Sequence, residues 1–138
     1  MGVIMILFSK EWVEALAEKL KHNDLYQKKA EGFDSYFQII AKPNPEKGVT
    51  ETKACGLLLP QATESWIGIR QNIDYTMTAS YEIFYKIVKG HLGPILAITT
   101  RKAIINGNFP KMMKYTAGTN LMIDIMKKVP VQFEGNFF

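Results

Sequence analysis

The sequence predicts an α+β fold: a five-stranded, mainly antiparallel sheet covered on one face by helices. The first observation is a change of period in the second half. An alternating run from 73 to 79 gives way at Ser80 to a helical period, and a β-type run returns from 102 to 105. The second observation is that the candidate strands of the first half follow one another at hairpin distances, which favours antiparallel pairing.

Size and composition are those of one globular domain. The chain has 138 residues, of which 47% are hydrophobic and 12% aromatic, and this is enough to bury a core. Its 17 basic residues are scattered among 13 acidic ones, with no Arg-rich run and a formal net charge of +4. This pattern does not favour nucleic-acid binding, but it is compatible with a weak attraction to anionic lipid or to the phosphates of acyl-CoA.

Cysteine content and the leading segment set further bounds. Cys55 is the only cysteine, so neither an internal disulfide nor a cysteine-based zinc site is expected. The apolar run at 2–8 is too short to span a bilayer and lacks the basic region and cleavage site of a secretion signal. We therefore expect a cytoplasmic protein, and no motif points to a cofactor or a metal.

The first half of the chain predicts two helices followed by strands. Ser9 is suited to cap a helix in which apolar residues recur at helical spacing up to Leu20. A second short helix is expected from Asp24 to Ala30, stopped at Gly32. An alternating strand at 33–41 and a turn-rich loop at 43–48 come next. Further strands are predicted at 52–59, 65–71, 72–79 and 102–106.

The segment after Ser80 predicts a helix, a break at Gly90 and a second short helix that begins at Pro94. Its apolar residues occupy more than one helical face, which is typical of deep burial or of a cavity wall. These residues are Phe84, Ile87, Val88, Leu92, Ile95, Leu96 and Ile98.

The C-terminal region is also predicted to be helical, starting at the cap Asn108. Gly118 is expected to break or kink it. A narrow apolar stripe then runs to Pro130, and it consists of Leu121, Met122, Ile125 and Met126. Four of the seven methionines lie in this region, namely Met112, Met113, Met122 and Met126. Flexible methionine side chains suit either a core or a ligand of variable shape.

No residue pattern predicts catalysis. His22 and His91 lie near predicted helix ends, where histidine commonly acts as a partner of the helix dipole. The chain has no His-x-x-x-His or Gly-x-Ser-x-Gly motif and no glycine-rich phosphate loop. Asp74 is the best single candidate for a buried acid, but a strand-start residue bonded to a backbone N–H explains it better. We expect no enzymatic activity.

The stretch from Asp74 to Phe109 resembles the sterol carrier protein 2 family of lipid-binding domains, and the segment from Phe8 to Leu20 resembles the first helix of its stand-alone prokaryotic members. The chain departs from the family pattern at 99–101 and in the longer loop at 43–53. The matching residues are Asp74, Thr76, Thr78, Lys89, Gly90, Pro94, Lys102, Ile104, Gly107 and Asn108.

This resemblance implies a five-stranded sheet and an apolar tunnel that binds, and transfers, a fatty acid, a fatty acyl-CoA or a sterol-like lipid. Transient contact with a membrane surface and homodimerisation are compatible with it. Two alternatives stay open: an enzyme or regulatory module on the same fold, and an interaction domain whose exposed tail Phe133–Phe138 docks on a partner or a second copy. The predicted ligand-binding residues are Trp66, Tyr75, Phe84, Ile87, Val88, Leu92, Ile95, Leu96, Met112, Met113, Leu121, Met122, Ile125 and Met126.

Overall fold

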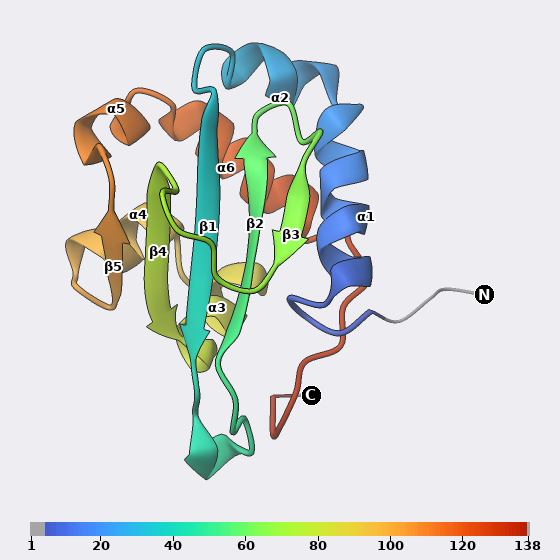
Figure 1. Cartoon of the computed structure of the whole chain (residues 1–138), viewed down its shortest axis with the longest axis vertical. Helices are drawn as coiled ribbons and strands as arrows, with labels where there is room; N and C mark the ends of the chain where they lie inside the picture. Colours follow the sequence, from blue (N-terminus) through green and yellow to red (C-terminus); the bar gives the residue numbers. More distant parts are fainter. Residues whose placement is uncertain (1–4, 138) are drawn as a thin grey trace.

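The structure is a computed structural model that describes residues 5–137. Its centre is a five-stranded sheet with the strand order β3-β2-β1-β4-β5 (Figure 1). The strands are β1 (Ser35–Lys42), β2 (Lys53–Leu59), β3 (Ser65–Ile67), β4 (Tyr75–Ser80) and β5 (Ala103–Asn106). Three of the four strand pairs are antiparallel, and the predicted α+β fold with a mainly antiparallel sheet is confirmed.

Helices cover one face of this sheet. The longest, α1 and α6, contact each other, and α1 also contacts β2 and β3 at the far edge. Figure 1 shows α3 and α6 behind the strands, with α4 and α5 beside β5. The helices are α1 (Lys10–Lys21), α2 (Asp24–Lys29), α3 (Tyr81–Val88), α4 (Pro94–Thr99), α5 (Phe109–Met113) and α6 (Thr116–Met126), with a short 3-10 turn at Pro45–Lys47.

Three helices begin at the caps that the sequence predicts. The side chain of Ser9 accepts a hydrogen bond from the backbone N–H of Trp12, and Ser80 does the same for Ile83. Asn108 accepts from the N–H of Lys111 at the start of α5. Each bond satisfies a backbone donor that would otherwise lack an intrahelical partner, so local chemistry alone fixes these starts.

One strand pair is not antiparallel, because the chain crosses the sheet between β3 and β4. β4 lies parallel to β1 and is separated from β3 by two strands. The predicted strands at 65–71 and 72–79, in direct succession, were wrong: β3 ends at Ile67, and β4 begins only at Tyr75. The chain leaves the sheet at Gly68, where φ is 92°, and segment 68–74 runs over the face opposite the helices before β4 begins (Figure 1).

Gln38 holds this crossover segment in place. It lies on β1, points to the face opposite the helices, and is only 2% exposed. Its side-chain oxygen accepts from the indole N–H of Trp66 at 3.1 Å and from the backbone N–H of Arg70 at 2.7 Å. The Arg70 guanidinium lies 4.5 Å from the Trp66 ring centroid, a cation–π contact. Gly56 leaves room for that ring, since a Cβ at this position would overlap it.

Both ends of the described chain pack into the fold. Leu7 and Phe8 are buried, and Ile6 pairs with Gln132 of the C-terminal tail. Phe133 and Phe137 are buried too, and their rings lie 4.7 and 4.9 Å from that of Tyr85. The expectation of an exposed tail at Phe133–Phe138 was therefore wrong for these two residues, while Phe138 and residues 1–4 lie outside the described part. None of the described helices is long and apolar enough to cross a membrane.

Candidate functional site

A cavity of about 90 Å³ lies between the sheet and the helices. Its floor is formed by inward side chains of β1, β2 and β4, and its walls by α3, α5 and α6. Nearly all of the lining is apolar, with only tyrosine and threonine hydroxyls as side-chain polar groups. Six of the predicted residues take part in it: Phe84, Ile87, Val88, Met112, Met122 and Met126.

The central strand shows that the core is incompletely filled here. β1 has a neighbouring strand on both sides, so its helix-facing side chains should be among the most buried of the sheet. Phe37 and Ile39 are nevertheless only partly buried, whereas Gln38 between them is almost fully buried on the other face. Both line the cavity. Close packing is normal in a protein interior, and it is absent at this one point of the sheet.

A second apolar cavity of about 70 Å³ adjoins the first. It lies under α1, against Trp12, Val13 and Leu16. The two cavities share five lining residues: Phe37, Ile39, Leu59, Met122 and Met126. Met122 and Met126 stand one turn apart on α6, and both are only partly buried. The side chains of these two methionines therefore border both cavities, and a change of their rotamers would open or close the connection between the cavities.

The structure does not bring the other eight predicted residues into the cavity lining. Leu92, Ile95 and Leu121 pack against the core from its margin, and Ile125 is buried away from the cavity. Tyr75 is fully buried and stacks on Phe37, with ring centroids 5.8 Å apart, so it supports a lining residue. Trp66, Leu96 and Met113 lie elsewhere.

The positions of these three follow from simple geometry. Trp66 lies opposite Gly56 in the register and shares the outer face with Gln38, because side chains along a strand alternate between faces. Leu96 is 55% exposed and Met113 is 39% exposed. Pro94 and Met112 take the inward-facing positions of these two short helices.

None of the four strand residues that line the first cavity was predicted from the sequence. Phe37, Ile39, Leu59 and Met77 line the cavity from β1, β2 and β4. Their alternation was visible as an inward face, and this was the available signal. The remaining missed residues are Phe8, Tyr26, Ala30, Phe33, Pro94, Tyr115, Gly118, Thr119 and Ile123.

Gly118 has a different part from the predicted one. The helical region breaks at Lys114 and Tyr115, between α5 and α6, and Gly118 lies inside the first turn of α6. A Cβ added there would meet the Cβ of Ala30 at 3.2 Å. The glycine therefore allows α6 to approach the end of α2 closely, and the expected break at Gly118 was wrong.

Ionisable groups are sparse around the two cavities. Burial raises the pKa of the Tyr26 hydroxyl in the first cavity well above its ordinary value. Burial also raises the pKa of the Cys55 thiol in the second to about 12. Both groups are therefore neutral at physiological pH. One cation contacts a lining residue: the Nζ of Lys111 donates to Ser35 Oγ at 3.3 Å and lies 5.6 Å from the ring of Phe33, which lines the first cavity.

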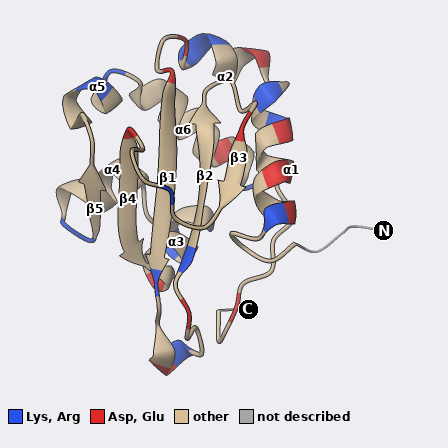
Figure 2. Ribbon diagram, in the orientation of Figure 1, with Lys and Arg blue, Asp and Glu red and all other residues tan. Residues whose placement is uncertain are grey.

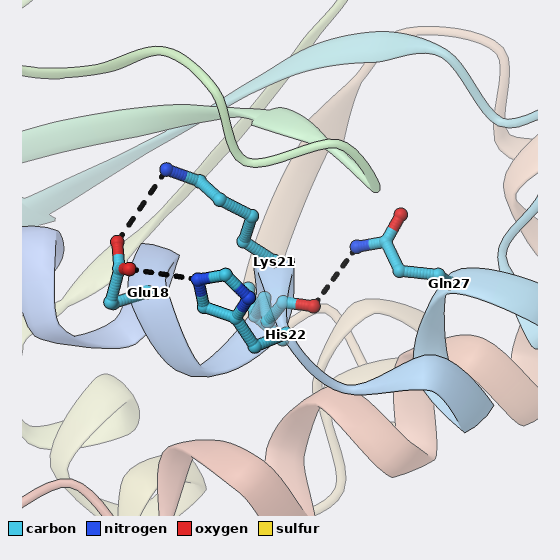
Figure 3. Close-up of polar contacts among 5 residues, drawn as sticks. Glu18, Lys21, His22 and Gln27 are labelled. Atoms are coloured by element: carbon cyan, nitrogen blue, oxygen red, sulfur yellow. Dashed lines mark hydrogen bonds and ion pairs between the residues drawn. The ribbon is translucent and has the colours of Figure 1, made fainter.

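The polar residues that sequence analysis weighed as catalytic lie apart from the cavities. Figure 3 shows His22 at the end of α1, where its Nε2 lies 2.9 Å from the Glu18 carboxylate, with Lys21 on the other oxygen. Asp74 accepts the backbone N–H of Tyr36 at 2.9 Å, as expected for a residue at a strand start. No group of three or more His, Cys, Asp or Glu residues suited to a metal occurs within residues 5–137.

Comparison with known proteins places the fold. No protein-family profile and no curated protein sequence matches the chain. Among solved structures, a crystal structure of sterol carrier protein 2 is 19% identical, with a TM-score of 0.79, and the match covers 89% of this chain and 98% of that one. A conserved hypothetical protein of Thermus thermophilus, described as a candidate sterol carrier protein, is 18% identical with a TM-score of 0.82, covering 98% and 96%.

A third similar structure is of a palmitated protein. It is palmitated sterol carrier protein 2-like 2 from Aedes aegypti, 16% identical, with a TM-score of 0.59 and coverage of 83% and 94%. The chain therefore has the sterol carrier protein 2 fold, and the predicted resemblance is confirmed at the level of the fold.

Proposed function

We propose that this protein binds a hydrophobic small molecule with a flexible alkyl chain, such as a fatty acid or a fatty acyl-CoA, between its sheet and helices and does not convert it chemically. The observation that carries the proposal is the half-buried state of Phe37 and Ile39 on the central strand, above an apolar cavity. Two comparisons support the proposal. The chain shares the fold of sterol carrier protein 2, and one of the structures similar to it is of a palmitated insect protein.

Unfilled apolar space has a stability cost that a ligand would remove. At about 24 cal/mol per Å³, a cavity of 90 Å³ corresponds to roughly 2 kcal/mol. An alkyl chain that fills it gains about 0.8 kcal/mol for each CH₂ removed from water. Binding by burial of area alone therefore suffices for a long chain.

The shape of the space favours a chain over a rigid ring system. Ligand pockets for drug-sized molecules usually measure about 300–1,000 Å³, whereas these two cavities measure about 90 and 70 Å³. A flexible chain can extend from one into the other when Met122 and Met126 change rotamer. A fused-ring sterol would require α6 to move outward as a whole. We therefore rank acyl chains above sterol-like lipids.

A polar head group finds its partner at the end of the larger cavity near Phe33. Lys111 lies beside the Phe33 ring, and its contact with Ser35 Oγ is a single hydrogen bond at 3.3 Å. A carboxylate or a phosphate at this end would replace that neutral partner by a charged one, which makes a stronger bond. The chain would then run inward under α6.

The test uses delipidated protein and a fluorescent long-chain fatty acid. We expect saturable binding of about one probe per chain, competition by palmitate, weaker competition by cholesterol, and recovery of palmitate unchanged. Native mass spectrometry of protein from its own cells would identify the resident lipid. Absence of saturable binding would refute the proposal, and consumption of palmitate would favour the enzymatic alternative.

A further inference from the structure

The charges of this chain are segregated along the sequence. Between 83 and 123 there is no aspartate and no glutamate. The same segment contains six basic residues: Lys86, Lys89, Arg101, Lys102, Lys111 and Lys114. Nearly a third of the chain therefore contains no acidic residue, and the charges are less evenly distributed than the net charge of +4 indicates.

The fold gathers much of this segment along one edge. α4 contacts β5, the last strand of the sheet, and α5 follows β5 directly. Figure 2 shows basic residues at the turn before β5 and on α5, with no acidic residue on α4, β5 or α5. Asp74, at the start of β4, borders this edge, and its carboxylate is bonded to the Tyr36 N–H.

Most of these cations have no ionic partner. Lys86 pairs with Glu82 at 3.5 Å. The other five form no salt bridge with a carboxylate among residues 5–137, and Arg101, Lys102 and Lys114 are exposed. A row of cations without partners creates a positive potential that attracts an anionic surface.

The elements of this edge also carry exposed aliphatic side chains. Leu96 on α4 is 55% exposed, Ile104 on β5 is 58% exposed, and Met113 on α5 is 39% exposed. Each of the three elements thus presents one large apolar side chain to solvent. Apolar side chains next to lysine and arginine are the composition that binds the interface of an anionic bilayer.

We propose that this β5 edge, defined by Leu96, Arg101, Lys102, Ile104, Met113 and Lys114, docks on the surface of an anionic phospholipid bilayer. A second copy of the chain would bring like charges together. A nucleic acid would satisfy the cations but would leave the three aliphatic side chains without an apolar partner.

Docking at this edge would act on the walls of the cavity. Pro94 and Met112 line the cavity from the same short helices that carry Leu96 and Met113. A bilayer in contact with α4 and α5 therefore lies against the elements that separate the cavity from solvent. This coupling rests on the proposed function, whereas the docking itself does not.

The experiment measures flotation of the protein with two kinds of vesicle. One is a mixture of phosphatidylcholine and phosphatidylserine, and the other is pure phosphatidylcholine. The test variant is Arg101→Glu/Lys102→Glu, and the charge-matched control is Lys28→Glu/Lys29→Glu on exposed α2. Each basic residue near an anionic surface contributes about fivefold in partitioning. We expect partitioning onto the mixed vesicles to fall by more than about 25-fold in the test variant and by less than about threefold in the control. Leu96→Ser should weaken binding to the mixed vesicles without any change of charge.

Other outcomes are decisive as well. Equal losses in the test and control variants would mean attraction by net charge only, and equal binding to both vesicle types would remove the electrostatic argument. No flotation of the unaltered protein would overturn the proposal. The fluorescent fatty acid is titrated in parallel without vesicles. If the test variant loses flotation but keeps its affinity for the probe, docking is confirmed as separate from the cavity. If the unaltered protein floats with vesicles but binds no probe, the proposed function is refuted and the docking proposal stands.

Discussion

Replacing Met122 by tryptophan separates a ligand cavity from an ordinary core. Met122 borders both cavities and is itself only partly buried. An indole placed there would occupy space whose emptiness corresponds to roughly 2 kcal/mol. We expect the free energy of unfolding to stay unchanged or to rise by up to about 2 kcal/mol. Excluding only two CH₂ groups of a bound chain costs about 1.6 kcal/mol, so affinity for a long-chain acyl probe should fall by more than about tenfold.

Two measurements on one preparation check this expectation. Urea unfolding gives the stability, and an unchanged slope with urea shows that the folded state is equally compact. Titration with the fluorescent fatty acid gives the affinity. Stability that is kept or raised, together with lost binding, is the signature of space reserved for a ligand.

Ile125 provides the matched control on the same helix. It is 5% exposed and lines neither cavity. Ile125→Trp should therefore overpack a filled region and cost about 1–3 kcal/mol. If Met122→Trp costs as much as Ile125→Trp while the probe still binds with unchanged affinity, α6 is plain core and the reasoning is refuted.

Three further outcomes follow from the structure. Amide hydrogen exchange in 119–129 should slow when a fatty acid is added, and equal exchange with and without it would argue against α6 as the moving wall. Gln38→Leu should cost about 2–4 kcal/mol by urea unfolding, since it leaves the donors of Trp66 and Arg70 unpaired; a loss below about 0.5 kcal/mol would contradict this. The Cys55 thiol should resist labelling at pH 8 in the folded protein. Burial raises the pKa of this thiol from 9.0 to about 12, so the stability that the neutral thiol contributes is complete below pH 9 and declines between pH 9 and 12. Cys55→Ala should therefore make the alkaline decline of the free energy of unfolding shallower.

Local chemistry explains what the sequence could predict about the fold. Ser9, Ser80 and Asn108 cap helices by bonds to residues three positions ahead, so the information lies within one turn. The path from β3 to β4 was not accessible in the same way. It depends on bonds between Gln38 and Arg70, which are 32 residues apart, and no local pattern reveals such a pair.

The cavity lining was predicted in part on its helical side and missed on its sheet side. Periodicity tells which residues face inward, and it placed Phe84 and Met122 correctly on the inner faces of α3 and α6. It cannot tell whether the space in front of an inward residue is filled. The half-buried state of Phe37 and Ile39 depends on the packing of three layers at once, so it emerges only from the assembled structure.

Two of the described α-helices, α4 and α6, begin without a side-chain capping bond, and both line the larger cavity. The face of the sheet opposite the helices is tied by Gln38, and the C-terminal tail is tied by Tyr81, whose hydroxyl accepts the N–H of Glu134 at 3.0 Å. By contrast, α4 and α6 start at Gly93 and Tyr115 with no side-chain capping bond. Helices without caps open at a smaller free-energy cost than the sheet does. Both helices line the larger cavity, and both begin within the acid-free segment. We therefore expect a ligand to enter where α4 or α6 begins, because the uncapped first turn of a helix opens at a small free-energy cost.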